Sequence, residues 1–557
     1  MDNYQIAENF SLLSKLTDIH AENNFKAKSY AIVAFYIEKL PEQLSETPPE
    51  KIALIKGIGE SSAKKIIEIL ETGSLKALQE LIEKTPIGVI EMLNIKGIGP
   101  KKISTIWKEM EIESIGELLY ACKENRLKLY KGFGEKTQQN VIDTIEFYLS
   151  NQGSYLYPQV EAVEPQITAY LQKLFGAENV YLTGNFKRQV EIIDELEYVV
   201  NSSTENIKLK FQTANPPELL EENADSLLYK LLNGLKLRLY SDTENFAKKC
   251  FFTAGSPEFI NAFIFRFPNI NFPGAAGSDD SVVFKQAGIS YIPYSLRETP
   301  EIIDRAAAFA LPELIQPEDI KGIIHSHSNW SDGNNTLEEM ATAAKAQGFE
   351  YLVISDHSKS AFYAQGLSEE RIQAQHEQVN ALNSKLKDFK IFKSIESDIL
   401  YDGSLDYSNA VLATFDLVIA SVHSILKMIE EKAMQRLITA IENPYTTILG
   451  HMTGRLLLSR KGYPLDHKKI IDACAANNVV IELNAHPSRL DIDWRQINYA
   501  LEKNVLISID PDAHSIEGFK DTRYGVLAAQ KAMVTKEQNL SSMGLVEFES
   551  YLQKRKN

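Results

Sequence analysis

The feature that most constrains this chain is a series of seven short apolar strands in its C-terminal part, each followed at once by polar residues. They begin near Ile320 and alternate with amphipathic segments of helical length. This alternation predicts a parallel α/β barrel or sheet, whose strands present their carboxyl ends on one face, where chemistry collects. The strands read KGIIHSH, YLVISDH, KIFKSIES, LVIASVH, TTILGH, VVIELNAH and VLISIDPDAH.

Six of the ten histidines stand at these strand ends, together with three carboxylates. The histidines of the His-x-His pair are two residues apart, so on a regular strand both side chains point to the same face. The Asp-x-His pair at the last strand repeats that spacing. The nine predicted metal ligands are His325, His327, Asp332, His357, Glu396, His423, His451, Asp512 and His514.

Nine nitrogen and oxygen donors without a thiolate suit Mn²⁺ or Zn²⁺, with iron as a further option. At roughly three protein ligands each they would hold three divalent ions and leave positions open for water and phosphate. A single histidine is more often a core or surface residue than a ligand. The remaining histidines, His20, His376, His467 and His486, are interpreted in that way.

The motifs HSHSNWSDG, SDHS, SIESDILYDGSLD, SVHS, LGHMTGRLLL and DPDAHS resemble the polymerase-and-histidinol-phosphatase (PHP) superfamily, in the version fused to bacterial family X DNA polymerases. All nine positions of that family's metal ligands carry the expected residue type, although Met452 stands where a proline is usual. The resemblance implies a distorted seven-stranded α/β barrel and a trinuclear metal centre. It also implies a 3′–5′ exonuclease or a related 3′-end phosphoesterase. Arg455 is a candidate phosphate-binding residue, with a surface ion pair as the alternative.

Residues 1–150 have helical periodicity and contain a repeated glycine motif. It reads IKGIGESSAKKI from Ile55, IKGIGPKKISTI from Ile95 and, in a more degenerate copy, YKGFGEKTQQNV from Tyr130. This is a helix-hairpin-helix pattern, in which glycines let the backbone approach a phosphate at a helix N-terminus. The predicted DNA-binding residues are Gly57, Gly59, Lys65, Gly97 and Gly99, with plain helix-helix turns as the alternative.

The segment AENNFKAKSYAIVAFYIEKLP resembles the opening of family X polymerases, a small lyase-type domain. By that resemblance Lys65 falls on the Schiff-base lysine, although a hairpin lysine is more often a phosphate contact. The formal net charge of the whole chain is −16, which argues against nucleic-acid binding through a basic surface. DNA binding must therefore depend on local geometry.

In residues 151–300 the resemblance to a family X palm continues, but its catalytic carboxylates change. Glu195 and Glu197 occupy the Asp-x-Asp positions, and Arg238 stands where the third aspartate belongs. A glutamate moves its oxygens outward by roughly 1–1.5 Å, and Mg²⁺ tolerates this poorly because it demands a strict octahedron. Arg238 places a fixed positive charge where a cation should bind. These changes predict the absence of efficient polymerisation.

The expected domains are a lyase-like helical region (1–85), a fingers-like helix-hairpin-helix region (86–150), a degenerate palm and thumb (151–300) and a PHP domain (317–557). The preferred function is a DNA 3′–5′ exonuclease or 3′-end phosphoesterase acting in repair on gapped or recessed ends without sequence preference. The alternatives are an active repair polymerase with a PHP exonuclease, and a small-molecule phosphatase of the histidinol-phosphatase type. No membrane-spanning stretch or paired cysteines occur, so the expected location is the cytoplasm.

Overall fold

The computed structural model describes residues 2–21, 24–40, 42–95, 97–149, 153–212, 216–272 and 280–556. The chain divides into two compact units, Met1–Glu146 and Phe147–Asn557. Across the described residues, none of the helices combines the length and apolar character needed to cross a bilayer. Cys122, Cys250 and Cys474 are buried and form no disulfide.

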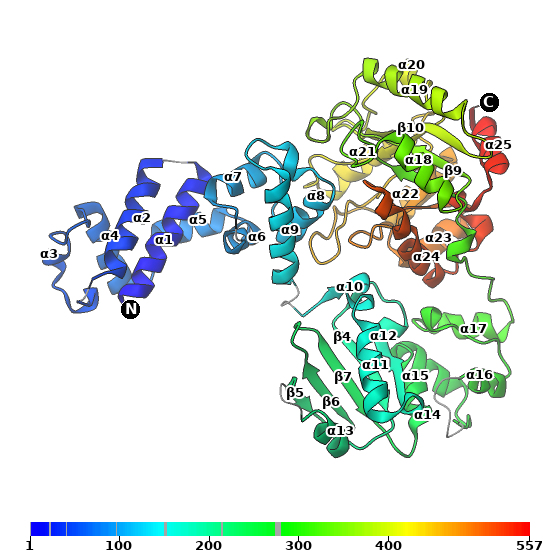
Figure 1. Cartoon of the computed structure of the whole chain (residues 1–557), viewed down its shortest axis with the longest axis horizontal. Helices are drawn as coiled ribbons and strands as arrows, with labels where there is room; N and C mark the ends of the chain where they lie inside the picture. The colour runs from blue at the N-terminus through cyan, green and yellow to red at the C-terminus, as the bar shows by residue number, and fades with distance from the viewer. Residues whose placement is uncertain are drawn as a thin grey trace. The chain divides into compact units, whose positions relative to one another are not determined.

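The first unit is built of helices (Figure 1). The first helix begins at a capping box, in which Asp2 accepts from the amide of Gln5, and buries one apolar stripe that includes Phe10 and Leu13. The helices of the unit are α1 (Asn3–His20), α2 (Asn24–Glu38), α3 (Pro49–Ile52), α4 (Glu60–Thr72), α5 (Lys76–Lys84), α6 (Ile87–Glu91), α7 (Pro100–Lys108), α8 (Ile115–Lys123) and α9 (Glu135–Leu149).

The glycine motifs form three turns of the same kind. Gly57, Gly97 and Gly132 have φ angles of +89°, +99° and +93°, a left-handed conformation that a side chain disfavours. The second glycine of the first two motifs, Gly59 and Gly99, is the N-cap of α4 and α7. The degenerate third copy thus keeps the backbone geometry of the other two.

The second unit begins with a five-stranded sheet in the order β2-β4-β7-β6-β5. All neighbours are antiparallel except β4 and β7, whose parallel register places Glu197 opposite Arg238. The strands are β2 (Val180–Thr183), β4 (Glu195–Val200), β5 (Glu218–Glu222), β6 (Ser226–Lys230) and β7 (Lys236–Ser241), and β1 (Tyr155–Leu156) pairs separately with β3 (Ile192–Ile193). The helices are α10 (Tyr157–Glu161), α11 (Glu164–Phe175), α12 (Gly184–Lys187), α13 (Thr204–Lys210), α14 (Phe246–Thr253), α15 (Pro257–Arg266), α16 (Ser281–Ala287) and α17 (Glu301–Ala307).

The C-terminal part of the unit contains seven parallel strands whose order in the sheet follows the chain. A parallel bridge between Ser326 and Ala513 joins the two ends of this sheet. The predicted seven-stranded α/β barrel is therefore confirmed as a nearly closed one. Its strands are β8 (Gly322–Ser326), β9 (Tyr351–Ile354), β10 (Lys390–Asp398), β11 (Leu417–Ser421), β12 (Ile448–Leu449), β13 (Val480–Asn484) and β14 (Ile507–Asp510).

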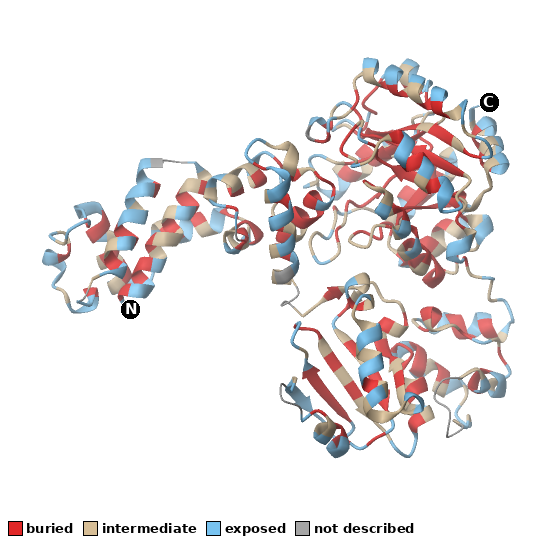
Figure 2. Cartoon of the chain, in the orientation of Figure 1, coloured by how far each residue is buried: buried red, intermediate tan, exposed pale blue. Residues whose placement is uncertain are grey.

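Helices surround the barrel strands, which are buried along their length (Figure 2). One of them, α25 (Leu545–Lys556), inserts Phe548 against Tyr351 at the start of β9, with ring centroids 4.5 Å apart. This aromatic contact fills the amino end of the barrel, so the carboxyl end is the face left for function. The other covering helices are α18 (Leu337–Ala346), α19 (Glu369–Asn383), α20 (Asn409–Leu412), α21 (Glu430–Ile441), α22 (His467–Asn477), α23 (Trp494–Glu502) and α24 (Thr522–Lys531).

Charged side chains connect the barrel to the five-stranded part within the second unit. The ammonium group of Lys531 on α24 is buried and donates to Glu298 Oε1 at 2.6 Å and to the carbonyl of Arg188 at 2.8 Å. Arg523 forms a two-pronged ion pair with Glu161, at 2.6 and 2.8 Å. A two-pronged ion pair fixes the relative orientation of its partners, so this contact helps to orient the barrel against the five-stranded part.

Candidate metal centre

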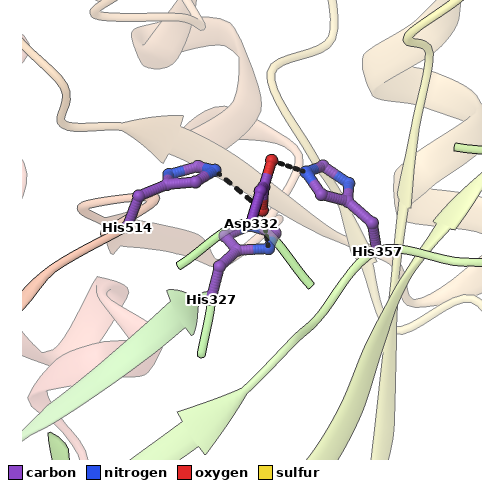
Figure 3. A group of neighbouring side chains, drawn as sticks. All are labelled: His327, Asp332, His357 and His514. Atoms are coloured by element: carbon purple, nitrogen blue, oxygen red, sulfur yellow. Dashed lines mark ion pairs between the residues drawn. The ribbon is translucent and has the colours of Figure 1, made fainter. Parts of the chain in front are cut away.

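The nine predicted ligands converge at the carboxyl ends of the barrel strands. Their side chains fall into three groups, within each of which one potential ligand atom per residue lies within 4.8 Å of the others. The groups are His327–Asp332–His357–His514, His325–His327–Asp512 and His357–Glu396–His423. Figure 3 shows the first, in which three imidazoles surround the carboxylate of Asp332.

Glu396 at the carboxyl end of β10 lies between several histidines. One of its oxygens, Oε1, is 3.0 Å from Nε2 of His423 and 3.0 Å from Nε2 of His451, while Oε2 is 2.9 Å from Nδ1 of His357. A carboxylate in this position can bridge two cations. His451, which belongs to none of the three groups, thus joins the centre through Glu396.

The two histidines at the end of β8 both reach the centre, but not because the strand is regular. The register of β8 against β9 shifts between Ile323 and Ser326, and His325 has a φ of +58°. His325 Nε2 lies 3.3 Å from Glu396 Oε1, and His327 Nε2 lies 3.1 Å from Asp512 Oδ1. Both imidazoles are buried.

The donor set fits divalent cations. Among the described residues, His325 Nε2, His327 Nδ1, Asp332 Oδ2 and Glu396 Oε2 are buried without a hydrogen-bond partner. Leaving one such polar group unsatisfied costs about 1–3 kcal/mol. Buried nitrogen and oxygen atoms that face one another without hydrogen bonds are what a metal ion would satisfy.

Further carboxylates orient the imidazoles, and the sequence motifs did not identify them. His423 Nδ1 donates to Asp398 Oδ1 at 2.5 Å, and His325 Nδ1 donates to Glu482. The buried Asp356 accepts from the hydroxyls of Ser328 and Ser331, which lie in the loop that carries Asp332. The contacts of Asp398 and Glu482 fix the tautomer and ring orientation of His423 and His325, whereas those of Asp356 hold the loop of Asp332.

The charge balance of the cluster shifts the pKa values of its members. Burial opposes protonation of His423, but Glu396 and Asp398 outweigh it and raise its pKa to about 9. Burial likewise opposes ionisation of Asp332, yet His357 and His514 hold the pKa of that carboxyl well below its usual range. For His451, burial and the nearby Arg489 lower the pKa to about 3. The centre therefore holds carboxylates that favour positive charge beside them.

Arg455 lies apart from these groups and has partners of its own. Its Nη1 is 2.5 Å from Asp493 Oδ2, and its Nε donates to the carbonyl of Arg489 at 3.0 Å. These contacts fit the ion-pair alternative. The phosphate-binding role of Arg455 stays a prediction, and these contacts do not favour it. The histidines interpreted as structural also lie outside the three groups; His376, for example, packs edge-on against Phe415.

Comparisons with known proteins agree with this architecture. Residues 324–486 match the PHP domain family, residues 1–75 a helix-hairpin-helix domain, and residues 89–146 a SAM-like helix-hairpin-helix tandem. The "DNA polymerase/3'-5' exonuclease PolX" of Bacillus subtilis (strain 168) is 28% identical over 96% of this chain and 97% of its own length. The chain is therefore similar over nearly its whole length to a family X DNA polymerase and 3′–5′ exonuclease, and it contains helix-hairpin-helix and PHP domains.

Other relatives are similar to only part of the chain. A "Probable phosphatase" of Acetivibrio thermocellus is 31% identical over 29% of the chain and 64% of its own length. "Probable phosphatase Teth514_1060" of Thermoanaerobacter sp. (strain X514) is 27% identical over 34% of the chain and 77% of its own length. Part of the chain is thus similar to proteins that are named as probable phosphatases.

In the five-stranded sheet, which the sequence predicts to be a polymerase palm and which we call the palm after that prediction, the carboxylates have internal partners. Arg238 on β7 donates to both oxygens of Glu195 on β4, at 2.5 and 3.1 Å. Glu197 accepts from the hydroxyl of Tyr240 at 3.0 Å and from the amide of Asn185 at 2.9 Å. At the positions where the sequence predicts the degenerate polymerase site, these side chains therefore satisfy one another through ion pairs and hydrogen bonds.

Four of the five predicted DNA-binding residues, the glycines, lie on the hairpin turns of the first unit. A Cβ atom added at Gly59, Gly97 or Gly99 would meet nothing within 4 Å, so internal packing does not require these glycines. Gly57 is different, because an added Cβ would collide with the ring of Tyr36. Lys65 lies half-buried on α4, and its roles stay predictions.

Proposed function

We propose that this chain is a metal-dependent DNA 3′–5′ exonuclease, or 3′-end phosphoesterase, acting in the cytoplasm in DNA repair. The observation that carries the proposal is the set of buried nitrogen and oxygen atoms at the barrel's carboxyl end, which face one another without hydrogen bonds. The relative from Bacillus subtilis, named as a polymerase and 3′–5′ exonuclease, supports the reaction.

The nine ligands would hold three divalent ions, Mn²⁺ or Zn²⁺, or iron. Bound ions would neutralise the phosphate oxygens in the transition state and make water a competent nucleophile near neutral pH. Asp398 and Glu482 would keep the Nε2 atoms of His423 and His325 aimed into the centre. Glu396, within reach of His357, His423 and His451, would keep the cations close together.

We propose that the chain lacks efficient polymerase activity. Arg238 neutralises Glu195 through two hydrogen bonds, and Glu197 is held by Tyr240 and Asn185. A magnesium ion would have to break these contacts and approach a guanidinium group that does not lose its proton. The palm would then serve as a support for the barrel, to which Lys531 and Arg523 connect it.

We propose that the helix-hairpin-helix turns of the first unit hold the DNA backbone without reading sequence. The exposed glycine turns at α4 and α7 leave backbone amides accessible to phosphate. This mode of binding needs little basic surface and is compatible with the negative net charge. The preferred substrates are DNA with gapped or recessed 3′ ends.

The decisive experiment incubates the full chain with Mn²⁺ and end-labelled gapped DNA, with and without nucleotides. We expect shortening of the labelled 3′ end, its abolition by EDTA, and no primer extension. Changing His325 and His327 to alanine should remove bound metal and hydrolysis, whereas the matched variant His467→Gln, at the start of α22, should keep both. A metal-free protein that cleaves DNA as fast as the loaded one contradicts the proposal.

One rival function is supported by the matches to proteins named as probable phosphatases. Under it, the barrel would act on a small phosphate ester and the helical unit would bind protein. Activity on a small phosphomonoester at a rate far above that on any DNA end would favour this rival.

A further inference from the structure

The rim of the barrel's carboxyl end carries exposed apolar side chains. In the described residues from 317 to 556, six large hydrophobic side chains are exposed, and five of them lie on loops that follow successive strands β9 to β12. The sixth, Val546, lies on α25, whose Phe548 fills the opposite end. We call the five residues the apolar rim: Phe362 (76% exposed), Tyr401 (56%), Ile425 (44%), Ile429 (70%) and Leu458 (46%).

Three of the four loops that carry the apolar rim, those after β9, β10 and β11, are joined by hydrogen bonds, each to the one that follows it along the chain. The amide of Ser360, in the loop of Phe362, donates to Asp406 Oδ2 at 2.6 Å, in the loop of Tyr401. Arg436 on α21 donates to the carbonyls of Leu400 and Ser424, both at 2.9 Å, and so joins the loop of Tyr401 to that of Ile425. Phe362, Tyr401, Ile425 and Ile429 of the apolar rim therefore rest on one connected scaffold.

The same scaffold leads directly to the candidate metal ligands. Phe362 follows His357 in the loop after β9, and Ile425 follows His423 in the loop after β11. The hydroxyl of Ser360 donates at 2.9 Å to Asp398 Oδ2, and Asp398 also accepts from His423. A ligand held on the apolar rim would thus extend over the metal centre.

Charge and chemistry identify the occupant. A chain with a net charge of −16 cannot rely on a broad basic surface to attract a nucleic-acid strand. Exposed aromatic side chains can hold unpaired bases instead, because every base offers a flat face for stacking. Tyr401 is 56% exposed, and Lys432 Nζ lies over its ring at 3.8 Å from the centroid, so a base would stack on the other ring face with a positive charge close by. In duplex DNA these base faces are covered by the neighbouring base pairs.

We propose that the apolar rim, with Phe362 and Tyr401 as its aromatic members, stacks the unpaired bases at the 3′ end of a DNA strand and delivers the terminal phosphodiester to the barrel centre. This inference rests on the proposed exonuclease function and names its substrate as a frayed or single-stranded 3′ end. Recognition is by base faces, so it is independent of sequence. Phe362 and Tyr401 act as positioning residues, and the metal ligands carry the chemistry.

The test compares two DNA strands that differ only in their 3′ tails, using the full chain with Mn²⁺. One tail contains thymidines and the other tetrahydrofuran abasic units, which keep the phosphodiesters and lack bases. We expect wild-type kcat/KM to be about five- to 150-fold lower on the abasic tail, the range that corresponds to one stacked base. Phe362→Ala combined with Tyr401→Ala should fall by a similar factor on thymidines and hardly change on abasic units.

Three controls separate positioning from damage. Val546→Ala, an exposed apolar residue away from the apolar rim, should behave as the wild type does on both tails. Phe362→Trp with Tyr401→Phe should restore the preference for bases, because stacking surfaces return. Hydrolysis of methyl 4-nitrophenyl phosphate, which has no base, should be equal in the wild type and the double-alanine variant.

Binding is measured separately with a 2-aminopurine in a phosphorothioate tail that resists hydrolysis. Stacking should quench its fluorescence with the wild type and much less with the double-alanine variant. A double-alanine variant that prefers bases as strongly as the wild type overturns the apolar-rim proposal alone. So does an equal loss on all substrates, since the loops would then only support the metal centre. A wild type that hydrolyses the small ester but no DNA overturns the proposed exonuclease, and the apolar rim with it.

Discussion

The barrel centre and the palm are both built from acidic side chains at strands, yet they differ in how those side chains are partnered. In the barrel, Glu396 faces imidazoles, and its Oε2 has no hydrogen-bond partner among the described residues. In the palm, Glu195 is neutralised by Arg238. Burying a charge without a compensating partner is costly. The barrel arrangement therefore indicates that cations bind there, whereas in the palm the guanidinium of Arg238 already balances the charge of Glu195.

The comparison teaches that residue type alone does not define a metal site. The palm has carboxylates, Glu195 and Glu197, at two of the three positions where a polymerase is expected to carry acidic residues, and at the third it has a fixed cation, Arg238. The barrel supplies histidines, which bind a metal only in their neutral form, so bound cations would replace the proton that Glu396 and Asp398 otherwise stabilise on His423. Each of the following predictions alters one side of this contrast.

The largest effect should follow Glu396→Gln in the barrel. The amide keeps the size of the side chain but removes the negative charge that lies within 3.0 Å of both His423 and His451. We expect bound metal to fall and kcat on DNA to drop by about a thousand-fold or more. Metal analysis and 3′-end shortening would measure it, with the exposed Glu339→Gln as the matched control. Full metal content and activity in the Glu396 variant would remove Glu396 from the centre.

A smaller effect should follow Glu482→Gln, which acts through His325. The buried Glu482 carboxylate accepts from His325 Nδ1 and from the amide of His451 at 2.6 Å. Its loss should weaken metal affinity about 10- to 100-fold, the usual range for a residue that orients a ligand. Competition with a chelator would show the change, and added metal should restore activity. The exposed Glu502→Gln on α23 is the control, and unchanged chelator resistance in Glu482→Gln would argue against the orienting role.

Much of the barrel centre was predictable because strand periodicity and residue type are local properties. The alternation of apolar strands and helices gave the barrel, and the histidines and acids at strand ends gave the predicted ligands. The orienting partners were not predictable, since Glu482 reaches His325 from a strand far along the chain. The left-handed conformation of His325 and the pairing of Arg455 with Asp493 depend likewise on tertiary context.

The palm shows the same limit in another form. The sequence predicts that Arg238 stands where a polymerase would carry an aspartate. The register that places Arg238 opposite Glu197 of β4 is known only from the fold. The third hairpin, degenerate in sequence, has the same glycine conformation at Gly132 as the other two. Within the turn motif it differs from the other two copies at Tyr130 and Phe133, which replace isoleucines, while both glycines are kept and the turn keeps its conformation.

Arg238→Ala should change stability and leave the activities as they are. The variant leaves Glu195 partly buried without its main partner, and we expect a loss of about 1–3 kcal/mol in the unfolding free energy of the second unit. Primer extension should stay absent in both proteins, and 3′-end hydrolysis should be unchanged. Chemical denaturation and a primer-extension assay would test this, with the exposed Lys503→Ala as the control. Synthesis that depends on Glu195 and Glu197 would show that the palm binds metal after all.

The smallest effect concerns His376 on α19, a histidine outside the metal centre. Burial and the nearby Lys393 lower its pKa from 6.5 to about 4, so the folded protein resists protonation that the unfolded chain accepts. As the pH falls from 6.5 towards 4, the unfolded state binds the proton first, and stability should decline across that window. Because the ring is only half-buried against Phe415, we expect about 1 kcal/mol after solvent screening. The measurement is the difference in unfolding free energy between the wild type and His376→Gln at pH 7 and at pH 4.5, which cancels the titration of all other groups. The wild type should lose more stability than the variant on acidification. An equal loss in both would mean that the imidazole is as easily protonated in the fold as in the unfolded chain.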